Sequence, residues 1–113
     1  MTELKSMSCT QPTKGGPSLS PSEIESYQAQ IPDWDIIEVE GVKRLVRQYK
    51  FGNFVEALQF TNRIGELAEQ EDHHPSILTE WGRVTISWWT HAVEGLHLND
   101  FITAAKSDLI YKS

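Results

Sequence analysis

The sequence predicts one α+β domain: a single four-stranded antiparallel sheet with helices packed on one face, in the order α-β-β-α-β-β-α. Two stretches, 34–51 and 77–90, alternate apolar and polar residues around a glycine-containing turn, which is typical of β-hairpins. Between them, residues 54–72 place apolar side chains at intervals of three, four and seven, which is typical of an amphipathic helix. The other face of the sheet is then left for solvent, a ligand or another subunit.

Residues 1–18 are predicted to be a flexible leader, because they are rich in serine, threonine, proline and glycine. Within them, the Lys-Gly-Gly-Pro segment at 14–17 is a strong break in secondary structure. The folded domain is expected to span 19–113 and to begin with a capping box, Ser-Pro-Ser-Glu, at 20–23. A short helix should follow and end at the Ile-Pro-Asp segment, 31–33.

The first hairpin is expected to turn at Glu40-Gly41, with strands at 34–39 and 42–51. An opposite-charge pair, an aliphatic pair and a cation–aromatic pair would then face one another across the strands. These pairs are Glu38 with Lys43, Ile36 with Leu45, and Trp34 with Arg47.

The long helix at 54–72 is expected to be capped by Asn53. Its predicted buried stripe consists of Phe54, Ala57, Leu58, Phe60, Ile64, Leu67 and Ala68. The end of the helix is acidic, which opposes the helix dipole. This mild misfit indicates that the acidic residues serve something other than stability.

The second hairpin is expected to turn at Gly82-Arg83 in a type II′ turn, with strands at 77–81 and 84–90. Alternation directs one set of side chains toward the core: Ile77, Thr79, Trp81, Val84, Ile86 and Trp88. By the same parity, His91 lies on the side of Ser87 and Trp89, away from that face.

The last helix is expected from Asp100 to about Tyr111. Its predicted buried residues are Phe101, Ala104, Ala105 and Leu109. Its N-cap is either Asn99, or His97 with Asp100 as the third helical residue.

Composition limits the classes of partner and compartment. The formal net charge of −6 argues against direct contact with nucleic acid, because binding to phosphates needs a basic face. With one cysteine, Cys9, the 113 residues can form no internal disulfide, so a reducing cytoplasm is expected. No apolar run approaches the roughly 18 residues of a membrane span, so no membrane contact is expected.

The residues with most chemistry lie at 69–75, Glu-Gln-Glu-Asp-His-His-Pro, and at His91. Three interpretations fit His73, His74 and His91 with the nearby carboxylates. They could be exposed polar residues, a metal site, or a set of acid–base catalysts that needs no metal. Adjacent histidines are a poor spacing for one ion. Pro75 disfavours helical geometry at His74, so a break here could turn both rings toward one cleft.

The ordered pattern resembles the signature of the pterin-4a-carbinolamine dehydratases. Its members, at fixed intervals, are Glu69, His73-His74-Pro75, Trp81, His91 and Asp100. Further matches are Trp34 near the first strand, Phe54 in the long helix, and Thr90-His91 followed by Gly95-Leu96. The resemblance extends over roughly Leu19 to Tyr111.

The resemblance implies that the enzyme dehydrates 4a-hydroxytetrahydropterin to quinonoid dihydropterin during tetrahydrobiopterin recycling, with no metal and no bound cofactor. It implies that His73, His74 and His91 are catalytic. His74 is then expected nearest N5, and His73 and His91 around the 4a-hydroxyl. Four more residues are expected to bind the substrate or to orient the imidazoles: Trp34, Glu69, Asp72 and Asp100. Trp81 is expected in the core instead.

The resemblance also implies a homodimer or homotetramer and a functional link to an aromatic amino-acid hydroxylase. An alternative is a protein-binding coactivator or assembly factor that uses the same fold. Two residues depart from the family pattern. Glu94 stands where a small residue is usual, and His97 stands where serine or threonine would cap the last helix. The second change should weaken the cap by around 1 kcal/mol unless Asn99 replaces it.

Overall fold

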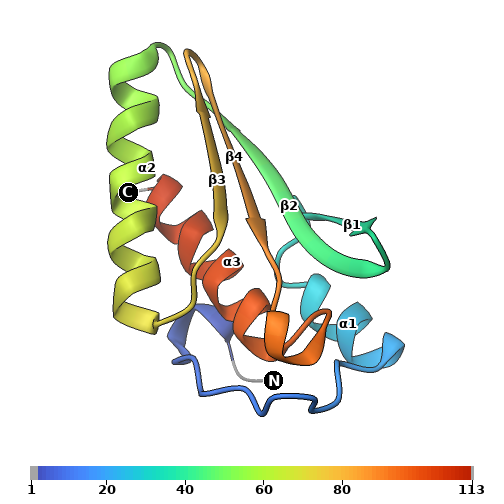
Figure 1. The fold of residues 1–113 in the computed structure, drawn as a ribbon. Helices are drawn as coiled ribbons and strands as arrows, with labels where there is room; N and C mark the ends of the chain where they lie inside the picture. The colour runs from blue at the N-terminus through green and yellow to red at the C-terminus, as the bar shows by residue number, and fades with distance from the viewer. Residues whose placement is uncertain (1–2, 113) are drawn as a thin grey trace.

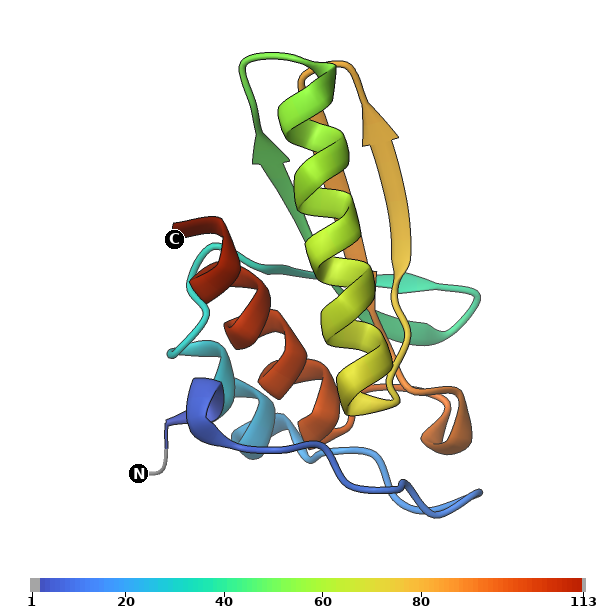
Figure 2. The same ribbon diagram turned by 90° about the vertical axis from the view of Figure 1, so that its left-hand side faces the viewer.

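The structure, a computed structural model, describes residues 3–112. Its elements are η1 (Leu4–Ser6), α1 (Pro21–Gln28), β1 (Asp35–Val39), β2 (Val42–Lys50), α2 (Phe54–Glu71), β3 (Ser76–Glu80), β4 (Arg83–Trp88), η2 (His91–Val93) and α3 (Leu98–Lys112). The strands form one antiparallel sheet in the order β1-β2-β4-β3. Helices α2 and α3 lie side by side on one face of that sheet (Figures 1 and 2). The predicted α+β class and element order are confirmed.

The first hairpin has the predicted turn and register. Glu40 and Gly41 both have positive φ, 51° and 80°, which is the geometry of a type I′ turn. Glu38 pairs with Lys43, and Ile36 with Leu45, as predicted. The expected cation–π contact between Trp34 and Arg47 is replaced by a contact of Arg47 with Tyr49 and by hydrogen bonds of both side chains to Asp108.

Arg47 instead stacks on Tyr49, with its guanidinium carbon 4.4 Å from the ring centroid. It also shares an acceptor with Trp34. Oδ1 of Asp108, in α3, accepts hydrogen bonds from Trp34 Nε1 at 3.0 Å, Arg47 Nη1 at 2.7 Å and the Tyr49 hydroxyl at 2.5 Å. This one carboxylate therefore ties the entry to β1 and the middle of β2 to α3.

The second hairpin turns one residue earlier than predicted. Glu80 pairs with Arg83, so the turn is Trp81-Gly82, and neither of these residues has a positive φ. The predicted type II′ turn is therefore wrong. Arg83 Nε donates to Glu80 Oε1 at 2.9 Å, and this ion pair closes the hairpin end. Trp81, predicted in the core, is 69% exposed because it lies in the turn.

The core side of this hairpin is otherwise as predicted. The new register shifts the pairing by two residues, so the parity of each strand is preserved. Val84, Ile86 and Trp88 are fully buried, and Ile77 pairs with Ile86. His91 lies beyond the strand, in η2, and is exposed.

Helix α2 begins after its predicted cap, where Asn53 Oδ1 accepts from the backbone N–H of Glu56 at 2.9 Å. Five of the seven predicted stripe residues are buried: Ala57, Phe60, Ile64, Leu67 and Ala68. Phe54 and Leu58 are 44% and 43% exposed, so their predicted burial is wrong. They point about 90° and about 130° from the centre of the buried stripe. In α3, Leu109 is likewise exposed, not buried as predicted, and Ala105 is only partly buried.

The predicted leader lies against the domain over the residues that the structure describes. Leu4 is fully buried in the core, and its backbone N–H donates to Gln30 Oε1 at 2.9 Å. Farther along, the backbone of Thr10 bonds to the side chain of Asn99. Composition alone predicts little fixed structure here, whereas these contacts come from residues far away in the sequence. Met1, Thr2 and Ser113 lie outside the described residues.

We predict that Asp108→Ala lowers the free energy of unfolding by about 3–5 kcal/mol, because it leaves Arg47 and two further donors without their acceptor. Urea unfolding followed by circular dichroism measures this loss. The matched control is Asp33→Asn. Asp33 is exposed and lies 3.7 Å from the same guanidinium, so its loss should cost less than about 1 kcal/mol. Equal losses in the two variants would contradict the assigned role of Asp108.

Candidate active site

His73 reaches the interior because α2 ends in a left-handed turn. Asp72 has φ 51°, and the backbone N–H groups of Asp72 and His73 both donate to the carbonyl of Ala68. The turn directs His73 inward, so the residue is only 8% exposed. Its ring stacks on Trp88 with centroids 5.4 Å apart and planes 16° apart. The imidazole is therefore fixed between the end of α2 and β4.

Asp100 is the polar centre of this site. It is fully buried in the first turn of α3, where the helix dipole favours a negative charge. Oδ1 lies 2.6 Å from His73 Nε2. Oδ2 accepts from the Thr90 hydroxyl at 2.9 Å and from the backbone N–H of His97 at 3.0 Å. An ionised carboxylate only accepts hydrogen bonds, so Nε2 of His73 carries a proton, and Nδ1 is the nitrogen that remains to exchange one.

His74 points to the surface. Its Nε2 is hydrogen-bonded to Glu69 Oε2, and both side chains are exposed. The pair joins the last turn of α2 to the segment before β3. Two adjacent histidines thus have different surroundings, one buried on a buried carboxylate and one at the surface on an exposed carboxylate.

His91 begins η2 and is exposed. Its ring meets Trp89 edge-on, with centroids 5.4 Å apart, and the Arg44 guanidinium lies 3.9 Å from the Trp89 ring centroid. The loop is closed at its base, because the backbones of Thr90 and Gly95 exchange hydrogen bonds at 2.9 and 3.3 Å. Since the Thr90 hydroxyl also binds Asp100, the start of the His91 loop is tied to the carboxylate that holds His73.

Five of the seven predicted site residues thus fall into two groups. His73, Asp100 and the chain beside His91 are joined by hydrogen bonds, and Glu69 is joined to His74. Trp34 is buried against Asp108, and Asp72 is exposed at the helix end. In the described part of the chain, no hydrogen bond or ion pair links either of them to an imidazole. Their roles in binding stay predictions.

The hydrogen bond from Thr90 to Asp100 has no signal in the sequence, whereas the alternative cap at His97, with Asp100 as the third helical residue, is confirmed. His97 Nδ1 accepts from the backbone N–H of Asn99 at 3.0 Å, while Asp100 accepts from the backbone N–H of His97. The imidazole thus takes the place of the usual serine or threonine in a capping box. The ring itself supplies the acceptor that a serine or threonine hydroxyl would supply, and the predicted weakening of the cap stays a prediction.

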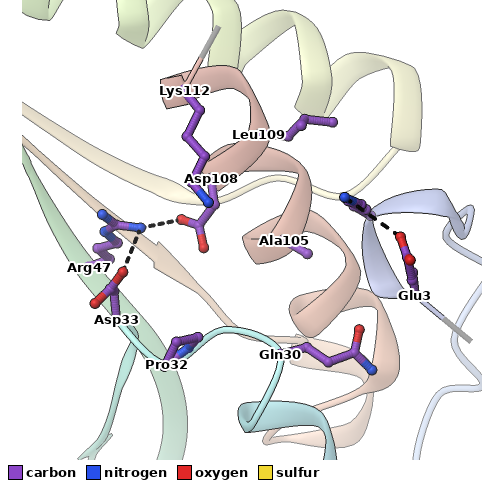
Figure 3. A pocket seen from close by; sticks show the side chains of 10 residues that line it. Glu3, Gln30, Pro32, Asp33, Arg47, Ala105, Asp108, Leu109 and Lys112 are labelled. Atoms are coloured by element: carbon purple, nitrogen blue, oxygen red, sulfur yellow. Dashed lines mark hydrogen bonds and ion pairs between the residues drawn. The ribbon is translucent and has the colours of Figure 1, made fainter. Parts of the chain in front are cut away.

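A cavity of about 430 Å³ lies elsewhere, between the end of α3, the chain after α1 and η1 (Figure 3). None of the three histidines lines it. Its charged residues are largely paired with one another, Arg47 with Asp108 and Asp33, and Lys5 with Glu3. The cavity is therefore separate from the histidine site and adds no acid–base group to it.

Two features are absent from residues 3–112. No group of three or more histidine, cysteine, aspartate or glutamate side chains in this range is placed to hold a metal ion. None of the helices in the same range is long and apolar enough to cross a membrane.

Comparisons with known proteins agree with one another. The family model described as pterin 4 alpha carbinolamine dehydratase matches residues 17–110. A Microcystis aeruginosa protein assigned as a pterin-4-alpha-carbinolamine dehydratase is 54% identical over 112 residues, which cover 99% of this chain and 97% of that protein. A Nitrosococcus oceani protein with the same assignment is 53% identical over 99% of both chains. A crystal structure of a transcriptional coactivator/pterin dehydratase from Brucella melitensis superposes with a TM-score of 0.75 at 29% identity, covering 83% of this chain and 98% of that one.

We predict that His97→Ala lowers stability by about 1 kcal/mol near neutral pH, whereas His97→Ser keeps the cap and most of the stability. Partial burial lowers the pKa of His97, an effect that the nearby Asp100 carboxylate opposes and His73 reinforces. The ring accepts a hydrogen bond only when it is neutral.

Because the folded-state pKa of His97 is the lower one, the unfolded chain takes up this proton first as pH falls. The contribution of His97 to the free energy of unfolding is therefore fully present above the ordinary histidine pKa of about 6.5. It is lost progressively as the pH falls below that value. Urea unfolding at about pH 7.5 and about pH 5.5 measures the free energy of unfolding. Between these two pH values it should fall by more in the native chain than in His97→Ser. The same loss in both proteins would argue against the imidazole cap.

Proposed function

The chain belongs to the pterin-4-alpha-carbinolamine dehydratase family, and we propose that it dehydrates 4a-hydroxytetrahydropterin by metal-free acid–base catalysis with His73, His74 and His91. Enzymes of this class are hydro-lyases. The observation that carries the proposal is the buried pair of His73 and Asp100, because it fixes one imidazole in one tautomer beside a second histidine.

The reaction needs one proton given and one proton taken. The C4a–O bond breaks, and the hydroxyl leaves as water after it receives a proton. N5 loses a proton, and its electron pair forms the C4a–N5 double bond of the quinonoid dihydropterin. Histidine suits both transfers because its ordinary pKa lies close to neutral pH.

In this proposal the protonated form of His73 gives its Nδ1 proton to the leaving hydroxyl, and His91 lies beside the same hydroxyl. Since Nε2 of His73 donates to Asp100, proton exchange with the substrate takes place at Nδ1. The carboxylate also compensates the positive charge of the ring in its protonated form. His91 lies at the exposed end of the loop that Thr90 ties to Asp100, where it can meet the substrate.

His74 is the proposed base at N5. Its Nε2 is engaged by Glu69, which leaves Nδ1 to accept the proton. Because both side chains are exposed, water screens this pair more than the buried one. Glu69 is accordingly proposed to orient His74. Asp72 and Trp34 are proposed to contribute to binding of the pterin.

We place the enzyme in tetrahydrobiopterin recycling in the cytoplasm, in functional connection with an aromatic amino-acid hydroxylase. Hydroxylases of this kind release the 4a-hydroxy adduct as the product of their cofactor, so a dehydratase must consume it. The single thiol, Cys9, is consistent with a reducing compartment.

We predict that His73→Ala, His74→Ala and His91→Ala each lower kcat for dehydration by about 10²–10⁴, the usual contribution of a general acid or base. Ultraviolet absorbance follows the loss of freshly generated 4a-hydroxytetrahydropterin. The matched control is His97→Ser, which removes the fourth histidine, keeps a helix cap, and should leave the rate near that of the native enzyme. A metal chelator should have no effect. Loss of the rate on chelation would overturn the metal-free mechanism.

A second copy of the chain is the proposed partner of α2. Three apolar side chains on its first two turns are substantially exposed: Phe54, Val55 and Leu58. Strands β1 and β3 are the two edges of the sheet in residues 3–112, and such edges can pair with another chain. These surfaces support a homodimer or homotetramer. The coactivator alternative would use the same helix surface, and the solved Brucella relative carries both functions in its description.

We predict that Val55→Lys combined with Leu58→Lys reduces the oligomer to a smaller species. Light scattering coupled to gel filtration gives the mass of the native protein and of the variant in solution. Gln70→Lys, at an exposed position near the other end of α2, adds the same kind of charge about 18 Å from Leu58 and should leave the mass unchanged. If the double variant keeps the native mass, α2 is not the interface between copies.

A further inference from the structure

The N-terminal segment 9–15, here called the strap, runs beneath the end of α2 and the start of α3 toward η2 (Figures 1 and 2). We propose that the strap is a positioning element of the active site, which acts through Glu71 and Asn99. This inference rests on the proposed function, because it assigns the strap a role in holding the three catalytic histidines in register. The family model matches residues 17–110, so the strap lies outside the matched region.

The strap is tied down at three points, and each point is next to a site residue. The backbone N–H of Cys9 donates to Glu71 Oε1 at 2.8 Å, two residues before His73. The backbone N–H of Gly15 donates to the carbonyl of Ala92 at 2.7 Å, directly after His91.

The middle tie is made by Asn99, directly before Asp100. Asn99 Oδ1 accepts from the backbone N–H of Thr10 at 3.0 Å, and Asn99 Nδ2 donates to the carbonyl of Thr10 at 2.6 Å. The side chain thus recognises one strap peptide through both of its polar atoms. Asn99 is 2% exposed, so this amide is enclosed where the strap crosses α3.

Glu71 is held equally firmly. Its other oxygen, Oε2, accepts from Lys106 Nζ at 2.9 Å, and its side chain is mostly buried. Burial alone would raise the pKa of Glu71, but the Cys9 N–H and the Lys106 ammonium together hold that pKa below its usual range. The carboxylate is therefore charged at neutral pH and makes a strong acceptor for the strap.

The three ties join segments that carry different parts of the site. The end of α2 carries His73, the start of α3 carries Asp100, and η2 carries His91. Asp100 and Thr90 link these segments from inside, and the strap links them from outside. Proton transfer is sensitive to shifts of about 1 Å, so an undocked strap should lower kcat although no strap residue needs to touch the pterin.

Cys9 provides a report of strap docking that is independent of catalysis. It is the only cysteine of the 113 residues and is half-buried. Burial, with Glu71 beside it, raises the pKa of the Cys9 thiol to about 12. A docked strap therefore keeps the thiol protonated and slow to react, and release of the strap would speed alkylation.

The test compares Asn99→Leu, which keeps the approximate size but removes both bonds to Thr10, with Glu71→Ala and its conservative counterpart Glu71→Gln. Thr13→Ala is the matched control, because Thr13 lies in the strap with an exposed side chain. Each protein is measured for Cys9 alkylation by iodoacetamide, for the ¹⁵N shifts of the His73 ring, and for kcat and KM. Circular dichroism establishes that each is folded.

We expect Asn99→Leu and Glu71→Ala to alkylate at least about tenfold faster, to shift the His73 ring signals, and to lose about tenfold in kcat with little change in KM. Glu71→Gln, which keeps an acceptor for Cys9, should recover much of the loss. Thr13→Ala should match the native enzyme. Faster alkylation with unchanged His73 signals would overturn the inference, as would unchanged alkylation in both variants.

A measurement on the native chain covers the case in which the variants fail to fold. If strap and site are coupled, a bound pterin must favour the docked strap by the same factor that docking favours the pterin site. Dihydrobiopterin, a stable dihydropterin, should therefore slow Cys9 alkylation. Binding without protection of Cys9 would overturn the inference. An enzyme that lacks dehydratase activity but shows coupled Cys9 and His73 signals would contradict only the proposed reaction.

Discussion

The buried carboxylate of Asp100 is the constraint on which the arrangement of the site depends. It accepts hydrogen bonds from His73, from the hydroxyl of Thr90 and from the backbone of His97, which come from three separate parts of the chain. A buried charge is tolerated only when it is surrounded by donors in this way. The same interactions that satisfy Asp100 therefore also fix the tautomer of one imidazole that is proposed to be catalytic, close one loop and start α3.

This dependence explains the unequal surroundings of the three proposed catalysts. His73 is enclosed and stacked on Trp88, so its position is set by the core. His74 and His91 are exposed and are held by Glu69 and by the loop behind Trp89. A rigid group inside and two accessible groups at the surface suit a reaction in which one proton is delivered and another is removed at adjacent atoms of a bound ring.

Much of the fold could be predicted because its signals are local. The alternation of the strands, the Glu40-Gly41 turn and the Asn53 cap depend on neighbouring residues, and the structure has all of them. Trp81 was misplaced because the pair of Glu80 with Arg83 shifts the turn by one residue.

The candidate site was predicted less completely. Its residues are predicted from the resemblance of their spacing to the family signature, but that spacing does not show which partner each one meets. The ties from the N-terminal segment join residues 62 and 89 positions apart, which no local pattern reports. The ring of His97 replaces a hydroxyl at the cap, and residue preferences assign this role to other side chains. A ¹⁵N spectrum of the histidine rings at neutral pH tests the pairing of His73 with Asp100 most directly. We expect the neutral ring of His73 to occur as the single tautomer protonated at Nε2, and Asp100→Asn to lose this preference. A mixture of both tautomers at His73 in the native enzyme would contradict this pairing.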